Sequence, residues 1–279
     1  MELLAHPIDT IGLIALGFGV GAYGTLIGAG GGFVLMPVML LLYPHESPEV
    51  LTSISLVVVF FNTLSGSEAY ALMKRIDYKS GLLFAGAAIP GAVLGALNTS
   101  HVPRHLFDLV FGVILLSAAV FIILKPKAGH RDQGTRSPHN LWTNRHLTDA
   151  HGIAYDYSFN PLLGVGISVF VGYLSSFLGI GGGIVHVPAL AYFLHFPVHI
   201  ATATSHFILA IMAFSATLVH ILSGTFSHGV HRSISLSIGV LLGAQLGAHL
   251  SDRIKGIWMI RSLALALGLV ALRILTANL

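Results

Sequence analysis

The 279-residue chain is 54% hydrophobic and only 9% charged, with a mean hydropathy of +0.83. Soluble domains carry roughly a quarter charged residues, so this composition excludes an ordinary soluble fold and predicts an integral membrane protein. The absence of cysteine excludes a disulfide framework, a thiolate metal site and cysteine catalysis. The formal net charge is +3, and the 14 Lys and Arg residues mostly lie in loops, so we expect no nucleic-acid partner.

The first ten residues carry two acidic side chains and no Lys or Arg. A cleavable signal peptide needs a basic segment there, so we expect the first apolar run to stay in the protein. Five apolar runs follow, at 11–27, 33–43, 51–70, 81–97 and 106–124. After a polar, basic stretch, a second set of five lies at 161–178, 184–194, 200–222, 233–250 and 257–277. We therefore divide the chain into a first membrane repeat (1–124), a linker (125–158) and a second membrane repeat (159–279).

The second run of each set is only 11 residues long, at 33–43 and at 184–194. A helix needs about 20 residues to cross a bilayer, so neither run crosses it alone. We interpret each as a re-entrant segment or as half of a broken helix. Broken backbone is tolerated inside a membrane only where it is buried in protein or lines a polar cavity.

A duplicated glycine motif precedes each short run. Gly28-Ala29-Gly30-Gly31-Gly32 through Pro37 is echoed by Gly179-Ile180-Gly181-Gly182-Gly183 through Pro188, an offset of 151 at both ends (179 − 28 and 188 − 37). Paired glycine breaks at corresponding positions of two halves point to a transporter's binding site.

Loop charges predict an orientation. If the 71–80 loop is cytoplasmic, the 125–158 linker and the 251–256 loop are cytoplasmic too, and most basic residues lie inside. Both termini are then periplasmic, and an odd number of crossings per half makes the halves run in opposite directions. The predicted fold is an all-α integral membrane protein, an inverted-topology repeat of two five-segment halves. Many secondary transporters use this arrangement for alternating access.

The glycine clusters suit an anion. Each one opens a helix, where free backbone N–H groups and the positive end of the helix dipole can hold negative charge without Lys or Arg. The alternative is close helix packing, which we favour for Gly91/Gly95 and Gly243/Gly247. The predicted substrate-binding glycines are Gly28, Gly30, Gly31, Gly32, Gly179, Gly181, Gly182 and Gly183.

Polar residues in the third run of each half are candidates to line the substrate path, because polar side chains on spanning helices tend to face the bundle interior. The alternative is interhelical hydrogen bonding without a ligand. The candidates are Thr52, Ser53 and Asn62 in the first half and Thr204, Ser205 and His206 in the second. Glu68 and His220 match at an offset of 152 (220 − 68) and, with His186, are candidates for proton coupling.

The glycine motifs, with Leu26-Ile27 and Phe177-Leu178 before them, and the Ala203-Thr204-Ser205 element resemble the TauE/SafE sulfite exporter family. Leu51-Thr52-Ser53 departs from that family's alanine-threonine pattern. The resemblance covers nearly the whole chain. It implies a permease of the bacterial inner membrane that exports sulfite, sulfoacetate or related organosulfonates.

We therefore expect a secondary transporter whose partners are a small anionic substrate and the lipid bilayer. An anion channel, or a permease for another small oxyanion or a carboxylate, is the alternative. The sequence leaves open whether the protein forms a homo-oligomer. The linker histidines His130, His139, His146 and His151 fit no metal spacing, so we expect no metal and no other cofactor. An intramembrane enzyme would need a catalytic pair, and the sequence shows none with convincing spacing.

Overall fold

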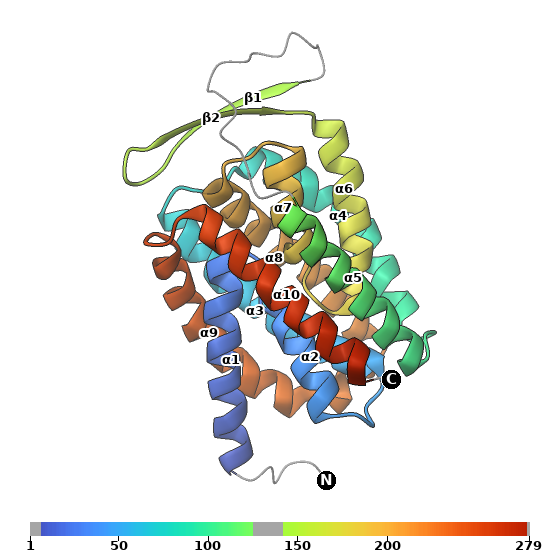
Figure 1. The fold of residues 1–279 in the computed structure, drawn as a ribbon. Helices are drawn as coiled ribbons and strands as arrows, with labels where there is room; N and C mark the ends of the chain where they lie inside the picture. The colour runs from blue at the N-terminus through green and yellow to red at the C-terminus, as the bar shows by residue number, and fades with distance from the viewer. Residues whose placement is uncertain (1–6, 125–141, 278–279) are drawn as a thin grey trace.

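Residues 7–124 and 142–277, which this computed structural model describes, form a helical bundle with one small β-hairpin (Figure 1). The first half contains α1 (Pro7–Ile27), α2 (Gly32–Leu42), α3 (Pro48–Leu72), α4 (Tyr78–Thr99) and α5 (Arg104–Leu124). The hairpin strands are β1 (Thr143–Thr148) and β2 (Ala154–Phe159). The second half contains α6 (Pro161–Leu178), α7 (Gly183–Pro188), the π-helix η1 (Ala189–Phe193), α8 (Val198–Leu222), the 3-10 turn η2 (Thr225–His228), α9 (Val230–Ser251) and α10 (Gly256–Ala277).

Eight of the described helices are long and apolar enough to cross a membrane. Two shorter apolar helices, Gly32–Leu42 and the continuous pair Gly183–Phe193, follow the glycine motifs. The prediction of an all-α integral membrane protein is confirmed. The two short runs indeed form short helices.

The α1–α2 pair forms a helical hairpin, because both of its outer ends lie at the same end of the bundle. Thr10 Oγ1 of α1 is 3.5 Å from His231 Nε2 at the start of α9. The α2 end returns to the same place, where the Arg232 guanidinium lies 4.0 Å from the Tyr43 ring centroid. We call this the far end, because the β-hairpin lies at the other one (Figure 1).

The α6–α7–η1 segment enters from the hairpin end. The α6 helix starts directly after β2, and the chain returns to the hairpin after η1, where Phe196 packs on Tyr157 and Phe159. The two glycine-broken segments therefore enter the bundle from opposite ends.

Helices of each half pack mainly on helices of the other half. Helix α1 packs on α9 and α6 packs on α4, whereas α3 faces α8 and α5 faces α10. Glycines allow the close crossings: an added Cβ would collide with the Tyr173 carbonyl at Gly95 and with the Phe18 carbonyl at Gly243. These glycines therefore have the packing role that the small-residue interpretation gave them.

The β-hairpin was not predicted from the sequence, which indicated a solvated linker over 125–158. Its strands pair antiparallel, from Thr143 opposite Phe159 to Thr148 opposite Ala154. Residues at alternate positions of β2 are buried, so the strand presents an apolar face to the bundle. The earlier linker residues, among them Lys125, Lys127, Arg131, Arg136, His130 and His139, lie outside the described residues.

Ion pairs and hydrogen bonds fasten the hairpin to the helix ends. The Arg75 guanidinium lies 3.3 Å from Asp149 of the hairpin and 2.6 Å from Asp252 after α9. The Tyr157 hydroxyl donates to Asp77 over 2.8 Å. Burial and the Asp77 carboxylate raise the pKa of Tyr157 above its ordinary value, so the phenol stays protonated and donates.

Candidate substrate site

The two glycine turns touch each other in the interior of the bundle. A Cβ added to Gly32 would lie 2.7 Å from the carbonyl carbon and oxygen of Ile180 in the other turn. A Cβ on Gly183 would lie 2.5 Å from the Ala29 Cα. Real Cβ atoms do not approach backbone so closely, so only glycine permits this contact. Segments 151 residues apart thus form one buried centre.

Both turns share one backbone conformation. Positive φ values occur at the first, third and fourth positions of each motif, between 67° and 84°. Side chains rarely adopt this left-handed region, so the glycine pattern in the sequence sets the shape of the turn. The residues with positive φ are Gly28, Gly30, Gly31, Gly179, Gly181 and Gly182.

Each turn presents backbone N–H groups that form no hydrogen bond within the described residues. In the first turn these belong to Gly31, Gly32 and Phe33, and in the second to Gly181, Gly182 and Ile184. The first N–H groups of a helix have no partner inside the helix, and they carry its partial positive charge. The side chains nearest the turn glycines are neutral. The centre can therefore bind an anion through dipoles alone.

A threonine from the opposite half lies against each turn. Thr202 of α8 contacts Gly28, and Thr52 of α3 contacts Gly179. Both side chains are buried, and neither Oγ1 forms a hydrogen bond within the described residues. A buried hydroxyl without a partner costs about 1–3 kcal/mol, so these two donors are available to a ligand.

In the sequence, Thr52-Ser53 recurs as Thr204-Ser205 at an offset of 152 (204 − 52), which pairs Thr52 with Thr204, but the spatial pairing differs. Thr204 Oγ1 accepts a hydrogen bond from the Asp77 backbone N–H at the hairpin end, over 3.1 Å. Ser53 Oγ donates to the Val50 carbonyl over 2.7 Å, whereas Ser205 is buried with an unpaired hydroxyl. By contact with the turns, the counterpart of Thr52 is Thr202, which the repeat offset of 152 had obscured.

A polar network surrounds the first turn. Thr25 Oγ1 donates to Asn62 Oδ1 over 3.0 Å and lies 3.2 Å from His206 Nε2. The Tyr70 hydroxyl donates to the Thr25 carbonyl over 2.7 Å. Asn62 and His206 were predicted from the sequence, whereas Thr25 and Tyr70 were missed. A usable signal existed for Thr25, because a hydroxyl residue, Ser176, occupies the matching position 151 residues later.

The second turn has a simpler environment. Ser55 Oγ donates to the Gly179 carbonyl over 2.5 Å. Ser175 Oγ lies beside Gly182, and it forms no hydrogen bond within the described residues. His186, just beyond the turn, is buried with its Nε2 3.1 Å from Ser168 Oγ.

Glu68 and His220 lie at opposite ends of the bundle. Glu68 is near the C-terminal end of α3. Met73, which follows this helix, accepts a hydrogen bond at its carbonyl from the Ala150 N–H of the hairpin. His220 is in the last turn of α8, which begins at the hairpin end, so it lies at the far end. Since α3 and α8 each have 25 residues and a helix rises about 1.5 Å per residue, the structure does not bring this pair together.

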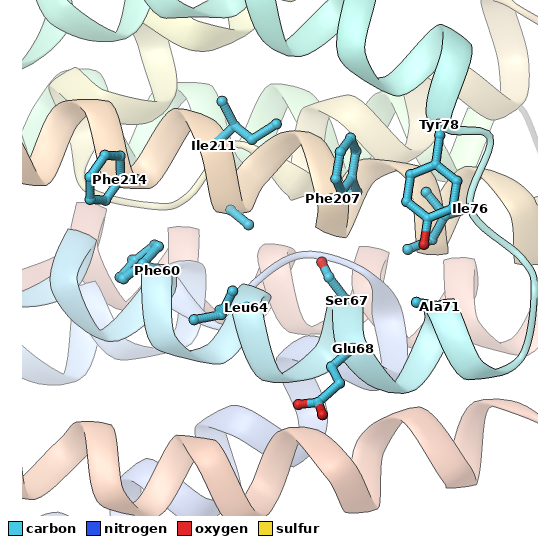
Figure 2. A pocket seen from close by; sticks show the side chains of 11 residues that line it. Phe60, Leu64, Ser67, Glu68, Ala71, Ile76, Tyr78, Phe207, Ile211 and Phe214 are labelled. Atoms are coloured by element: carbon cyan, nitrogen blue, oxygen red, sulfur yellow. The ribbon is translucent and has the colours of Figure 1, made fainter.

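An apolar cleft of about 520 Å³ opens between α3 and α8 (Figure 2), and no glycine of either turn lines it. Phe60, Phe207 and Phe214 line it, with Tyr78 at one end. Figure 2 shows the Glu68 carboxylate directed away from the rings of Phe207 and Tyr78. The cleft offers hardly any polar groups, so it does not suit a small anion.

The sequence matches the family described as "Sulfite exporter TauE/SafE" over residues 13–274. It is 34% identical over 218 residues to "Probable membrane transporter protein YunE" of Bacillus subtilis, covering 76% of this chain and 78% of that protein. It is 26% identical over 218 residues to a "Probable membrane transporter protein" of Methanocaldococcus jannaschii, covering 76% and 73%. No solved structure matches the chain significantly.

Proposed function

The chain belongs to the TauE/SafE sulfite exporter family, and from this premise we propose that it exports small sulfur-containing anions such as sulfite, sulfoacetate or other organosulfonates. It would act as a secondary transporter with alternating access. The observation that carries the proposal is the contact of two glycine turns that enter from opposite ends and present unpaired N–H groups. Such a centre replaces part of an anion's hydration shell without a fixed counter-charge, so the anion can leave again.

The exchange of helix contacts between the halves supports an inverted-topology repeat. In such repeats the substrate lies at the interface of the two halves, and one half rocks against the other around it. The turns here lie at that interface. Every residue from Gly28 to Phe33 is buried, so the centre is closed in this conformation, as one intermediate of alternating access requires.

We propose that the hairpin end faces the cytoplasm of a bacterial cell and that both termini are periplasmic. At the hairpin end, the described loops and the strand β1 carry Lys74, Arg75, Arg145, Arg253 and Lys255, whereas Arg104 and Arg232 lie at the far end. This bias follows the positive-inside rule. A membrane potential that is negative inside favours anion exit by about 2.3 kcal/mol per charge per 100 mV, so export can be driven without elaborate coupling.

Flux from proteoliposomes tests the proposal. We expect saturable efflux of sulfite or of an organosulfonate from vesicles that hold the purified protein. A pH gradient applied in separate runs would reveal proton coupling, for which Glu68, His220 and His186 stay predictions. Non-saturating, voltage-driven current would indicate an anion channel instead. If a cation or a neutral solute is transported and none of these anions is, the proposal is wrong.

A further inference from the structure

The side chain of Asn62 carries a buried amide donor beside the first glycine turn. Asn62 is completely buried, and its Nδ2 forms no hydrogen bond within the described residues. A Cβ added to Gly31 would lie 3.3 Å from this nitrogen, so the amide faces the turn where the Gly31 and Gly32 N–H groups are also unpaired. Buried amide donors in proteins are nearly always satisfied, which makes a ligand acceptor the physical expectation here.

The direction of the hydrogen bonds fixes which side of the Asn62 amide faces the turn. The Thr25 hydroxyl has a single proton, which it donates to Asn62 Oδ1 over 3.0 Å. Thr25 Oγ1 must then accept from His206, whose Nε2 lies 3.2 Å away. With Oδ1 engaged in this way, the NH₂ group of Asn62 is the part of the amide that faces Gly31.

Packing keeps the relay in place. The Tyr70 hydroxyl donates to the Thr25 carbonyl, and the Tyr70 ring meets the His206 ring edge-on at 5.6 Å. Thr25, His206 and Tyr70 are each at most 1% exposed. A donor held by such neighbours loses little conformational entropy when it binds, which favours tight and selective binding.

Among the residues that the structure describes, the second turn has no equivalent of this relay. A Cβ added to Gly182 would lie 3.1 Å from Met212 Cε, an apolar atom, and not beside an amide donor. Ser176, the counterpart of Thr25, forms no side-chain hydrogen bond within the described residues. The Ser175 hydroxyl beside Gly182 is a single donor that is free to rotate.

We propose that one oxyanion binds off the pseudo-symmetry axis, at the N-terminus of α2. There Asn62 is a specificity-determining donor and Thr25 is the residue that positions it. The Asn62 NH₂ group and the Gly31 and Gly32 N–H groups together suit an anion with several acceptor oxygens, such as sulfite or a sulfonate, over a halide. This inference rests on the proposed function, because it names the place and the donors of the same site.

Sulfite binding to the purified protein, measured by calorimetry, and saturable sulfite efflux test the proposal together. Asn62→Asp has nearly the same shape and keeps the acceptor for Thr25, but it loses the donor and adds negative charge. We expect it to raise the sulfite Kd at least tenfold. The matched second-turn variant Ser175→Ala should change Kd by less than about threefold, since it removes only a rotating neutral donor.

Thr25 variants test the positioning role. Thr25→Val keeps the shape but removes the hydroxyl, so we expect a severalfold higher KM for efflux at nearly unchanged kcat. Thr25→Ser restores the hydroxyl and should restore KM. The control Ser176→Ala should leave both values unchanged. Thermal melting of each variant separates these effects from misfolding, and Asn62→Asp keeps the inference testable if Thr25→Val does not fold.

Two results would overturn the inference. One is a sulfite Kd for Asn62→Asp equal to that of the wild type. The other is equal loss of affinity in the first-turn and second-turn variants, which would indicate a symmetric site. If the wild type itself neither binds nor transports these anions, the proposed function fails instead, so the two failures are distinguishable.

Discussion

The two glycine turns have the same backbone but different surroundings. Each has positive φ at equivalent glycines, unpaired N–H groups and a threonine from the other half. Only the first is tied to a chain of polar side chains, through Thr25, whereas the second lies against Met212 and Ser175. The same glycine spacing therefore gives the same turn in both halves, whereas the side chains around the turn differ.

The largest effect should come from separating the turns. Gly32→Ala and Gly183→Ala each place a methyl group against the backbone of the opposite turn, which cannot move aside as a side chain can. We expect both variants to lose transport and to be destabilised by about 3 kcal/mol or more, because overpacking a close backbone contact is costly. Thermal melting and sulfite efflux measure the two effects.

Gly19→Ala and Gly166→Ala are matched controls, since nothing lies within 4 Å of a Cβ at either position. Both should keep stability and transport. If Gly32→Ala or Gly183→Ala transports normally, the turns do not need their contact, and the common centre is not the site.

The hairpin breaks the equivalence of the two ends, and its anchor can be removed. Asp149→Asn leaves the buried Arg75 with a weaker partner and should loosen the hairpin by about 3 kcal/mol, as expected when one member of a buried ion pair is lost. Limited proteolysis around 143–159 or hydrogen exchange measures this. Asp156→Asn, which removes an exposed contact with His146, should change nothing.

Acid should have the same effect as Asp149→Asn. Burial raises the pKa of Asp149, but the N–H groups of Ile153 and His151 and the Arg75 guanidinium outweigh it, so the pKa lies below its ordinary value. A carboxylate whose pKa is lower in the folded state stabilises the fold at pH values above its unfolded-state pKa of about 3.9. This stabilisation is lost as the pH falls through the folded-state pKa. The hairpin should therefore stay protected at neutral pH and open below about pH 4. Equal protection at both would contradict the anchor.

A smaller effect distinguishes the glycines at the fourth position of each motif. Gly31→Ala and Gly182→Ala both place a side chain at positive φ, which costs about 1–2 kcal/mol. The Gly31 Cβ would also meet the Val20 carbonyl oxygen, whereas the Gly182 Cβ would meet the movable Ser175 and Met212 side chains. We expect Gly31→Ala to lower the melting temperature more. The reverse order would show that the first turn is the more adaptable one.

The smallest change in stability should come from the two threonines that cross between the halves. Thr52→Val and Thr202→Val each remove a buried, unpaired hydroxyl, so each should be neutral or stabilising by about 1 kcal/mol. If these hydroxyls bind the anion, KM for efflux should rise although the protein is no less stable. Unchanged KM in both variants would limit the donors to the turns and Asn62.

Much of the fold could be read from the sequence, because it depends on local properties. Apolar runs of bilayer length predicted the described helices that are long enough to cross a membrane, and the 11-residue runs predicted the short ones. The hairpin was missed because β2 alternates within a polar stretch, and its buried face exists only against Phe84 and Phe196. Likewise, the Thr204 hydroxyl accepts a hydrogen bond from the Asp77 N–H because the α3–α4 loop packs on α8. No repeat offset in the sequence reveals this contact.

The membrane fold and the conformation of both glycine turns follow from the sequence, because hydrophobic length and glycine φ are properties of single segments. The contact between the turns, the approach of Thr52 and Thr202 to them, and the hydrogen bond from Thr25 to Asn62 arise only in the folded protein. Those contacts depend on where helices distant in the sequence cross. A hydrogen bond is made or lost over less than an ångström, a precision that sequence spacing does not carry.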